Sequence, residues 1–155
     1  MSSIKIQMEK TNKLQIIEHI ISEIAELIPD YIAIPDDLSI SNGNVAICII
    51  DEDGVVSGKL YGSNKIRSRE SFRVAWTKAS QVWITGFKTG EFETLVYGNK
   101  INEDDYGISR PDMIGWEGGQ PVILKDGIRL SIGFSGFRGL SDLEIVIKAI
   151  QRAKL

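Results

Sequence analysis

The run VAICII, Val45 to Ile50, constrains the fold more than any other stretch of this sequence. It is apolar without interruption and rich in β-branched residues, a pattern typical of a central strand buried on both faces. Asp53-Gly54 predicts a tight turn, after which Val55 to Leu60 returns as a second strand. A hairpin of this kind indicates an antiparallel sheet.

The segment before the hairpin predicts a long amphipathic helix. Apolar residues recur at helical spacing from Leu14 to Ile28, with Thr11 or Asn12 as the N-cap and Pro29 as the stop. The residues before it, up to position 12, are expected to form a short strand or an N-terminal arm. Residues 31–44 carry two turn signals and are expected to be irregular or to add a short strand.

Two further helices are expected after the hairpin. One begins near Ser68 or Ser71, either of which can cap it, and ends at Gly86. The other closes the chain, where Ser141 and Glu144 have the spacing of a capping box. A short helix near residues 88–97 and a strand pair turning at residues 126–127 lie between them. Helices before, between and after the strands predict an α+β (α/β) fold in which helices cover both faces of the sheet.

Composition excludes several classes of protein. A chain of 155 residues fits one domain, and its net charge of −3 argues against a nucleic-acid partner. No apolar run approaches the ~20 residues of a membrane span, and the first residues do not resemble a secretory signal, so we expect a cytoplasmic protein without a membrane partner. The single cysteine, Cys48, lies in the apolar run and is expected to be a buried, inert thiol.

Candidate chemistry is sparse. The one histidine, His19, cannot build a zinc site alone; it is either a helix-surface residue or an axial heme ligand, for which one imidazole suffices. The stretch GFSGFRG resembles a nucleophile elbow, but Phe137 stands where that motif needs glycine. Several cations between Lys59 and Lys78 indicate either a solvated helix face or an anchor for a carboxylate-bearing ligand.

Three segments, taken in order, resemble the GlcG/HbpS-like family, which includes the C-terminal domain of PduO proteins. The first is VAICIIDEDGVV. The second has Lys78-Ala79 in its middle and ends in Thr-Gly-Glu-Phe. The third contains Gly118-Gly119-Gln-Pro and ends in Gly-Phe-Ser135-Gly.

The resemblance implies a profilin-like sandwich with a five-stranded antiparallel sheet over a single domain, residues 1–155. It also implies a homo-oligomer and, for several members, binding of heme or a related tetrapyrrole. Our first hypothesis is therefore a small-molecule-binding protein whose pocket lies between the second helix and the paired glycines. Ser71 and Lys78 would be polar contacts, Gly118 and Gly119 backbone donors, and His19 the iron ligand.

Two other hypotheses remain open. A cofactor-free enzyme on the same scaffold would use Lys78, Glu91 or Glu117 as acid or base. A structural accessory subunit would instead use the aromatic stripe of Phe72, Trp76 and Trp83 as an interface.

Overall fold

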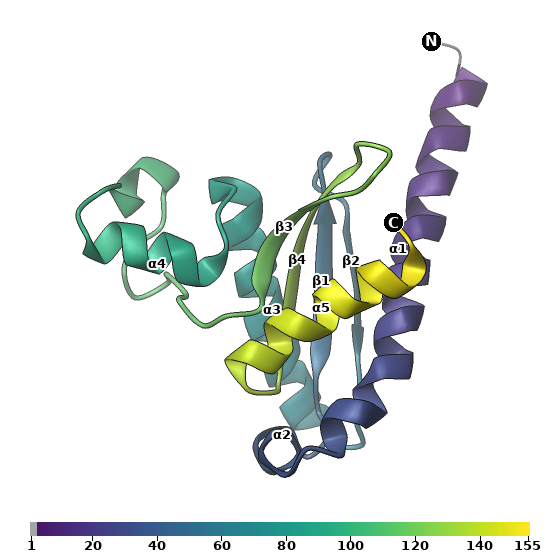
Figure 1. The fold of residues 1–155 in the computed structure, drawn as a ribbon. Helices are drawn as coiled ribbons and strands as arrows, with labels where there is room; N and C mark the ends of the chain where they lie inside the picture. Colours follow the sequence, from purple (N-terminus) through teal and green to yellow (C-terminus); the bar gives the residue numbers. More distant parts are fainter. Residues whose placement is uncertain (1–2) are drawn as a thin grey trace.

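The computed structural model describes residues 3–155, except for the side chains of residues 5–11. Pairs of strands lie between groups of helices along the chain (Figure 1). In order, the elements are α1 (Ser3–Ile32), α2 (Pro35–Ser41), β1 (Ala46–Asp51), β2 (Val56–Leu60), α3 (Lys65–Thr85), α4 (Thr89–Tyr97), the 3-10 helix η1 (Glu103–Tyr106), β3 (Gly119–Ile123), β4 (Arg129–Ser135) and α5 (Gly139–Ala153).

The sheet has four strands in the order β2-β1-β4-β3, and every neighbouring pair is antiparallel. The expected fifth strand is wrong for the described chain, because the segment that could have supplied it forms helix α2. Pro35 occupies the first turn of α2, and Asp36 and Asp37 place negative charge at its N-terminus, so this segment favours a helix. β1 lies between β2 and β4 and is buried along its whole length, which confirms the predicted central strand.

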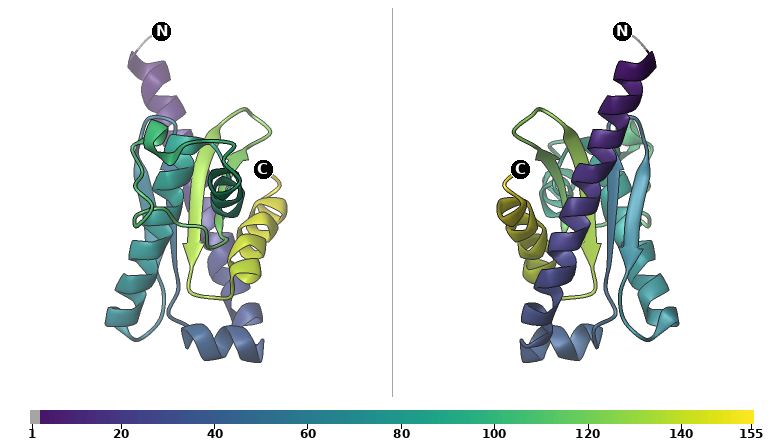
Figure 2. Two further views of the ribbon diagram at one scale, coloured as in Figure 1. Left: turned by 90° about the vertical axis from the view of Figure 1, so that its left-hand side faces the viewer. Right: turned by 90° about the vertical axis from the view of Figure 1, so that its right-hand side faces the viewer.

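Helices cover both faces of the sheet, as predicted (Figure 2). The alternate residues Val45, Ile47 and Ile49 join a large apolar core with α1, α5 and β4. The intervening residues of β1, which include Cys48, face α3. There they form a smaller apolar cluster with Ala75 and Ala79. The thiol is fully buried, and burial raises its pKa to about 12, so it behaves as the inert residue that the sequence predicts.

Glycines let α3 lie unusually close to the sheet. A β-carbon on Gly133 would lie 2.1 Å from the carbonyl oxygen of Ala75 and 2.7 Å from the backbone nitrogen of Ala79. Gly119 pairs with Gly133 on the adjacent strand, and a β-carbon there would lie 2.5 Å from the side chain of Thr89. The glycines that interrupt the C-terminal strands therefore form a flat floor for α3, without which helix and sheet could not approach this closely.

A separate apolar cluster supports the region between α3 and β3. Phe92 and Val96 of α4 are buried against Ile108, with Tyr106 in edge-to-face contact with Phe92 at 5.5 Å between ring centroids. In Figure 1 this region projects to one side of the sheet. It holds the loop of residues 107–116 beside α3.

Several helix ends differ from the sequence-based expectations. α1 extends back to Ser3, so residues 3–12 continue the helix rather than form a strand, and it passes through Pro29. Burial of Ile28 and Tyr31 on either side of the proline offsets the missing backbone donor. No helix of the described chain is long and apolar enough to cross a membrane.

The predicted N-caps of the two later helices are also wrong. Asn64, not Ser68 or Ser71, caps α3 by accepting from the backbone N–H of Arg67. Gly86 ends α3 in the left-handed conformation, as predicted.

At α5 the N-cap is Arg138, so Ser141 lies inside the helix and the predicted capping box does not form. The Ser141 hydroxyl donates instead to the buried carboxylate of Asp37, at 2.7 Å. That carboxylate also accepts from the backbone and guanidinium of Arg138, which ties α2 to the start of α5.

Candidate functional site

Lys78 is the most unusual polar residue of the fold. It points from α3 toward the end of β4 and is 1% exposed. Its ammonium donates to the backbone carbonyl of Phe134 at 2.8 Å and to the carboxylate of Asp142 at 3.2 Å. Asp142, at the start of α5, is also buried, and its other oxygen accepts from the backbone N–H of Phe137 at 2.9 Å. The pair joins helices on opposite faces of the sheet.

Burial dominates the protonation of both partners. Desolvation lowers the pKa of the Lys78 ammonium, although the nearby carboxylate of Asp142 acts in the opposite direction. Desolvation raises the pKa of Asp142 to about 7, against the opposing charge of Lys78. These shifts bring the proton affinities of the two groups closer together.

The structure brings Lys78, Gly118 and Gly119 together, as the predicted site requires. Gly118 has φ of +116°, and a β-carbon there would lie 2.9 Å from the ammonium of Lys78 and 2.6 Å from the carbonyl of Phe134. Both glycines are buried, and the carbonyl of Gly118 accepts from the backbone N–H of Phe134. Their contribution to this region is space for α3 and for Lys78. Their role as backbone donors to a ligand stays a prediction.

Ser71 and His19 lie apart from this cluster. Ser71 donates to the backbone carbonyl of Asn44 at 2.9 Å, near the other end of α3. His19 is on α1, which covers the opposite face of the sheet, and its half-exposed imidazole lies 3.5 Å from the carboxylate of Glu23. Neither residue lines any of five cavities of about 380 to 680 Å³ that the described chain forms. The structure therefore separates the predicted iron ligand from the predicted pocket.

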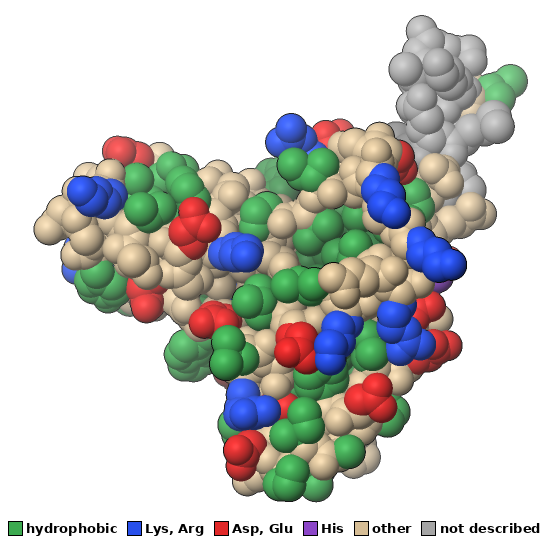
Figure 3. Space-filling view, in the orientation of Figure 1, with side chains coloured by type: hydrophobic (Ala, Val, Ile, Leu, Met, Phe, Trp, Pro, Cys, Tyr) green, Lys and Arg blue, Asp and Glu red, His purple; other side chains and the backbone are tan. Residues whose placement is uncertain are grey.

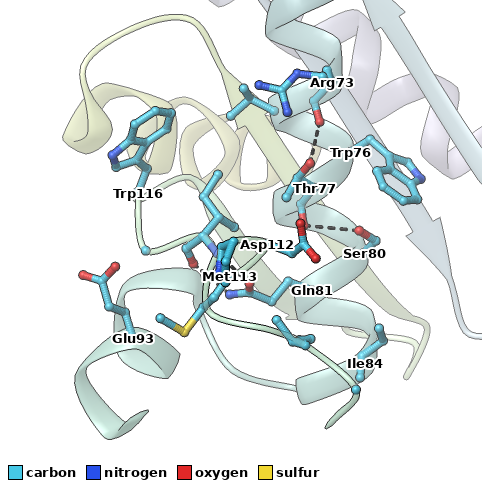
Figure 4. A pocket seen from close by; sticks show the side chains of 16 residues that line it. Arg73, Trp76, Thr77, Ser80, Gln81, Ile84, Glu93, Asp112, Met113 and Trp116 are labelled. Atoms are coloured by element: carbon cyan, nitrogen blue, oxygen red, sulfur yellow. Dashed lines mark hydrogen bonds between the residues drawn. The ribbon is translucent and has the colours of Figure 1, made fainter. Parts of the chain in front are cut away.

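The largest of these cavities, about 680 Å³, lies between α3 and the loop of residues 107–116 (Figure 4). Trp76 and Trp116 lie at its edges, and the thioether of Met113 and the side chain of Ile84 add apolar surface. Arg73 lies at one end of the cavity. Glu93 and Asp112 are its two carboxylates. Its walls are thus mainly apolar with a few charged groups, the usual character of a small-molecule site.

Two side chains fix the wall of this cavity. The buried amide of Gln81 donates to the carbonyl of Ile114 and accepts from its backbone N–H, both at 2.8 Å. Thr89 donates to the carbonyl of Trp116 at 2.6 Å. The loop is therefore held in place before any ligand arrives, which lowers the entropic cost of binding.

The aromatic stripe predicted on α3 is only partly buried. Phe72 packs against the smaller core cluster, whereas Trp76 and Trp83 are 48% and 47% exposed. The indole of Trp83 donates to the backbone carbonyl of Asp51 at 3.0 Å. The two acids proposed for an enzyme, Glu91 and Glu117, are both exposed and line a cavity beside Gly118 and Gly119. Glu117 also lines a cavity that includes Lys78.

Sequence reasoning missed Asp142, Gln81 and the loop of residues 107–116. A signal for Asp142 was present, because Lys78 and Asp142 each occupy the apolar face of their helices. Lys78 has the helical spacing of the buried residues Ala75, Ala79 and Val82. A buried ammonium needs a buried acceptor, so this spacing calls for an acid elsewhere in the core.

Comparison with known proteins identifies the fold. No protein-family model matches the chain, and no curated protein does. Among solved structures, the Klebsiella pneumoniae protein ORFY, described with the family model DUF336, aligns at a TM-score of 0.63 and 16% identity over 87% of this chain and 88% of that one. The structure of HbpS aligns at 0.53 and 17% identity over 87% and 86%. A PduOC–heme complex aligns at 0.59 and 18% identity over 86% and 91%.

The chain has the fold of these proteins. The resemblance to the GlcG/HbpS-like family is therefore confirmed at the level of the fold, and the sheet and its helices are those of a GlcG/HbpS-like structure. At this identity the likeness concerns architecture, and the binding properties of this chain rest on its own residues.

Proposed function

We propose that this GlcG/HbpS-like chain binds a flat, largely apolar small molecule in the cavity between α3 and the loop of residues 107–116. The observation that carries the proposal is the cavity itself. It has indole rings at its edges, and its outer wall is pinned by Gln81. The two indoles at the edges favour an aromatic ligand, and Arg73 offers a guanidinium to an acidic substituent.

Heme or a related tetrapyrrole is the specific ligand that we propose. One of the structures with this fold is a complex with heme. Of the residues that line the cavity, Met113 would hold the iron through its thioether, and Arg73 would pair with a propionate. The ion pair between Arg73 and Glu70 is on the surface, so exchanging it for a propionate costs little. Bound heme would supply redox or gas-binding chemistry.

His19 is the alternative ligand. Its imidazole is accessible on α1, outside the cavity. Ligation by His19 would therefore place heme on the surface of α1, on the opposite face of the sheet from α3. The two arrangements predict different effects of substitution.

Hemin titration, followed by visible absorption, tests the proposal. We expect a saturable shift of the Soret band with one hemin per chain, altered in Met113→Leu and unchanged in His19→Ala. A change only in His19→Ala would move the site to α1 and contradict the cavity assignment. No saturable shift in the intact chain would overturn heme as the ligand.

A further inference from the structure

The two edges of the sheet differ in how well they are protected against pairing with another strand. β3, at one edge, contains Pro121. The backbone N–H of Phe134 donates to the carbonyl of Gly118, and that of Leu124 to the carbonyl of Ile128, so the even-numbered residues bond within the sheet and position 121 points outward. Proline has no N–H to offer there, which blocks this edge. β2, at the other edge, contains no proline.

β2 presents unpaired backbone groups at its open edge. The backbone N–H of Tyr61 donates to the carbonyl of Val45, which fixes the phase of the ladder between β2 and β1. Bonds in an antiparallel ladder come from alternate residues, so the even-numbered residues of β2 direct their N–H and C=O groups away from β1. These residues are Val56, Gly58 and Leu60.

The side chains at these three positions form a symmetric apolar strip. They pair with the β1 residues that face α3, so they lie on that face of the sheet. Val56 and Leu60 are about half exposed, and the ring of Phe72 lies over Gly58 between them. The intervening Lys59 points to the opposite face, where its ammonium lies 5.3 Å from the centroid of the Tyr61 ring. Its charge therefore does not interrupt the strip.

This strip is complementary to a second copy of itself. An antiparallel copy centred on Gly58 places Val56 of one chain opposite Leu60 of the other, on both sides of a two-fold axis. Apolar side chains then meet as cross-strand pairs, and the outward N–H and C=O groups of each chain meet those of its partner.

The charges at the two ends of β2 favour the same arrangement. An acidic turn precedes the strand, and the basic start of α3 follows it. The exposed charged residues are Glu52 and Asp53 before β2, and Lys65, Arg67 and Arg69 after it. Lys13 pairs with Asp53, whose side chain is still 70% exposed. Antiparallel pairing brings the acidic turn of each copy toward the basic segment of the other, so opposite charges meet at both ends.

We propose that β2 is the interface of a homodimer in which two copies pair their β2 strands antiparallel about a two-fold axis at Gly58. The two four-stranded sheets then form one continuous sheet. The two α3 helices lie antiparallel on one face of it, and Val56 and Leu60 lose their exposure at the junction.

Disulfide cross-linking tests the register. Opposite residues in a hydrogen-bonded antiparallel pair have Cα atoms about 5.5 Å apart, which a disulfide can span. Chains with Val56→Cys are mixed with chains that carry Leu60→Cys and then oxidised. We expect a covalent dimer from the mixture and none from either variant alone, because the two copies of each position lie four residues apart along the junction. The native Cys48 is fully buried and takes no part.

The other edge of the sheet provides a matched control. Ile123 is on β3 and is 64% exposed. A mixture of Val56→Cys and Ile123→Cys chains measures cross-linking by random collision, and we expect no covalent dimer from it. Equal cross-linking in this mixture and in the mixture of Val56→Cys with Leu60→Cys would overturn the proposed register.

A proline at position 56 tests strand pairing itself. Because the N–H of Val56 points away from β1, Val56→Pro keeps the hydrogen bonds to β1 and removes one outward donor from each copy. Val56→Ala is the control, since it shortens the side chain and keeps the donor. By analytical ultracentrifugation, we expect the dimer dissociation constant of Val56→Pro to exceed that of Val56→Ala about ten- to a hundredfold, the effect of two lost hydrogen bonds.

Three results would overturn the proposal: a single-chain mass for the parent chain at every concentration, no covalent dimer from the mixture of Val56→Cys with Leu60→Cys, or equal dissociation constants for Val56→Pro and Val56→Ala. None of the substituted positions lines the cavity proposed for heme. Hemin titration of the same variants should match the parent chain, so the two proposals fail independently.

Discussion

The lack of a side chain at Gly133 allows α3 to lie close to the sheet. Because Gly133 has no β-carbon, the backbone of α3 at Ala75 and Ala79 rests directly on β4. No larger residue fits at position 133 unless the helix moves. The helix is also fixed by the hydrogen bond from Lys78 to Phe134 and by the hydrogen bond from Gln81 to Ile114.

We therefore expect Gly133→Ala to lower the free energy of unfolding by about 1 to 3 kcal/mol through overpacking, measured by urea denaturation. Gly90→Ala is the control. It lies in helix α4, where an added β-carbon meets its nearest atoms at 3.7 Å, so it should be neutral or stabilise by up to about 1 kcal/mol. Equal stability of Gly133→Ala and the parent chain would contradict the close-packed floor.

Individual residues show where sequence reasoning succeeds. The fully buried Cys48 was predicted correctly, because an apolar run with β-branched residues specifies burial without reference to distant parts of the chain. Lys78 lies beside Gly118, near which the sequence predicts the pocket, and its role in binding a ligand stays a prediction. Its partner Asp142 is 64 residues away in the chain. No local pattern specifies which acid will meet a buried ammonium.

At the scale of elements, the loop of residues 107–116 behaves as a wall fixed to α3. Gln81 forms both hydrogen bonds to Ile114, and the 87–116 region has its own apolar cluster behind that wall. Loss of these bonds would leave buried groups of Ile114 unpaired, at a cost of about 1 to 3 kcal/mol.

We expect Gln81→Glu to loosen the loop, because a carboxylate can accept from the N–H of Ile114 but cannot donate to its carbonyl. Hydrogen exchange of residues 107–116 should become roughly ten- to a hundredfold faster, and hemin affinity should fall. For hydrogen exchange, Ser80→Ala serves as the comparison, since that hydroxyl bonds within α3, to the carbonyl of Thr77. Unchanged exchange in Gln81→Glu would show that the apolar cluster alone holds the wall.

Most element types were predictable, but several of their ends were not. Periodicity and turn residues predict the strands and the main helices, because each signal lies within one segment. The predicted capping box of α5 was wrong because its side chains form contacts with other helices instead. Ser141 bonds to Asp37, a residue of another helix, and Glu144 accepts from Tyr31 at 2.7 Å. The fifth strand failed because residues 35–41 form a helix, which the family resemblance did not anticipate.

For the whole molecule, exposed apolar residues at one edge of the sheet indicate where copies of the chain could associate. Strand β2 is an edge of the sheet, and Val56 and Leu60 on it are 49% and 46% exposed, with Lys59 as its one charged residue. On the face seen in Figure 3, acidic and basic side chains are interspersed rather than separated by sign. An apolar edge in such a mixed surface favours contact with another copy of the chain over a strongly charged partner.

We expect light scattering to give a mass of at least two chains. Replacing Val56 and Leu60 together by Lys should reduce that mass to one chain, because charge on an edge strand opposes strand pairing. Ile66→Lys, at an 84% exposed position on α3, should leave the mass unchanged. A single-chain mass at every protein concentration would contradict the expected homo-oligomer.

The antiparallel pair β1–β4 also determines when the chain can fold. Its two strands form the centre of the sheet, yet α3, α4 and most of the loops lie between them in the sequence. During synthesis, β1 and β2 can form a hairpin early, but the apolar residues of β1 have no central partner until β4 has emerged from the ribosome. Closing so long a loop costs entropy before the contact compensates for it. Folding is therefore expected to be slow and late, with the early hairpin exposed to chaperones while the rest of the chain is made.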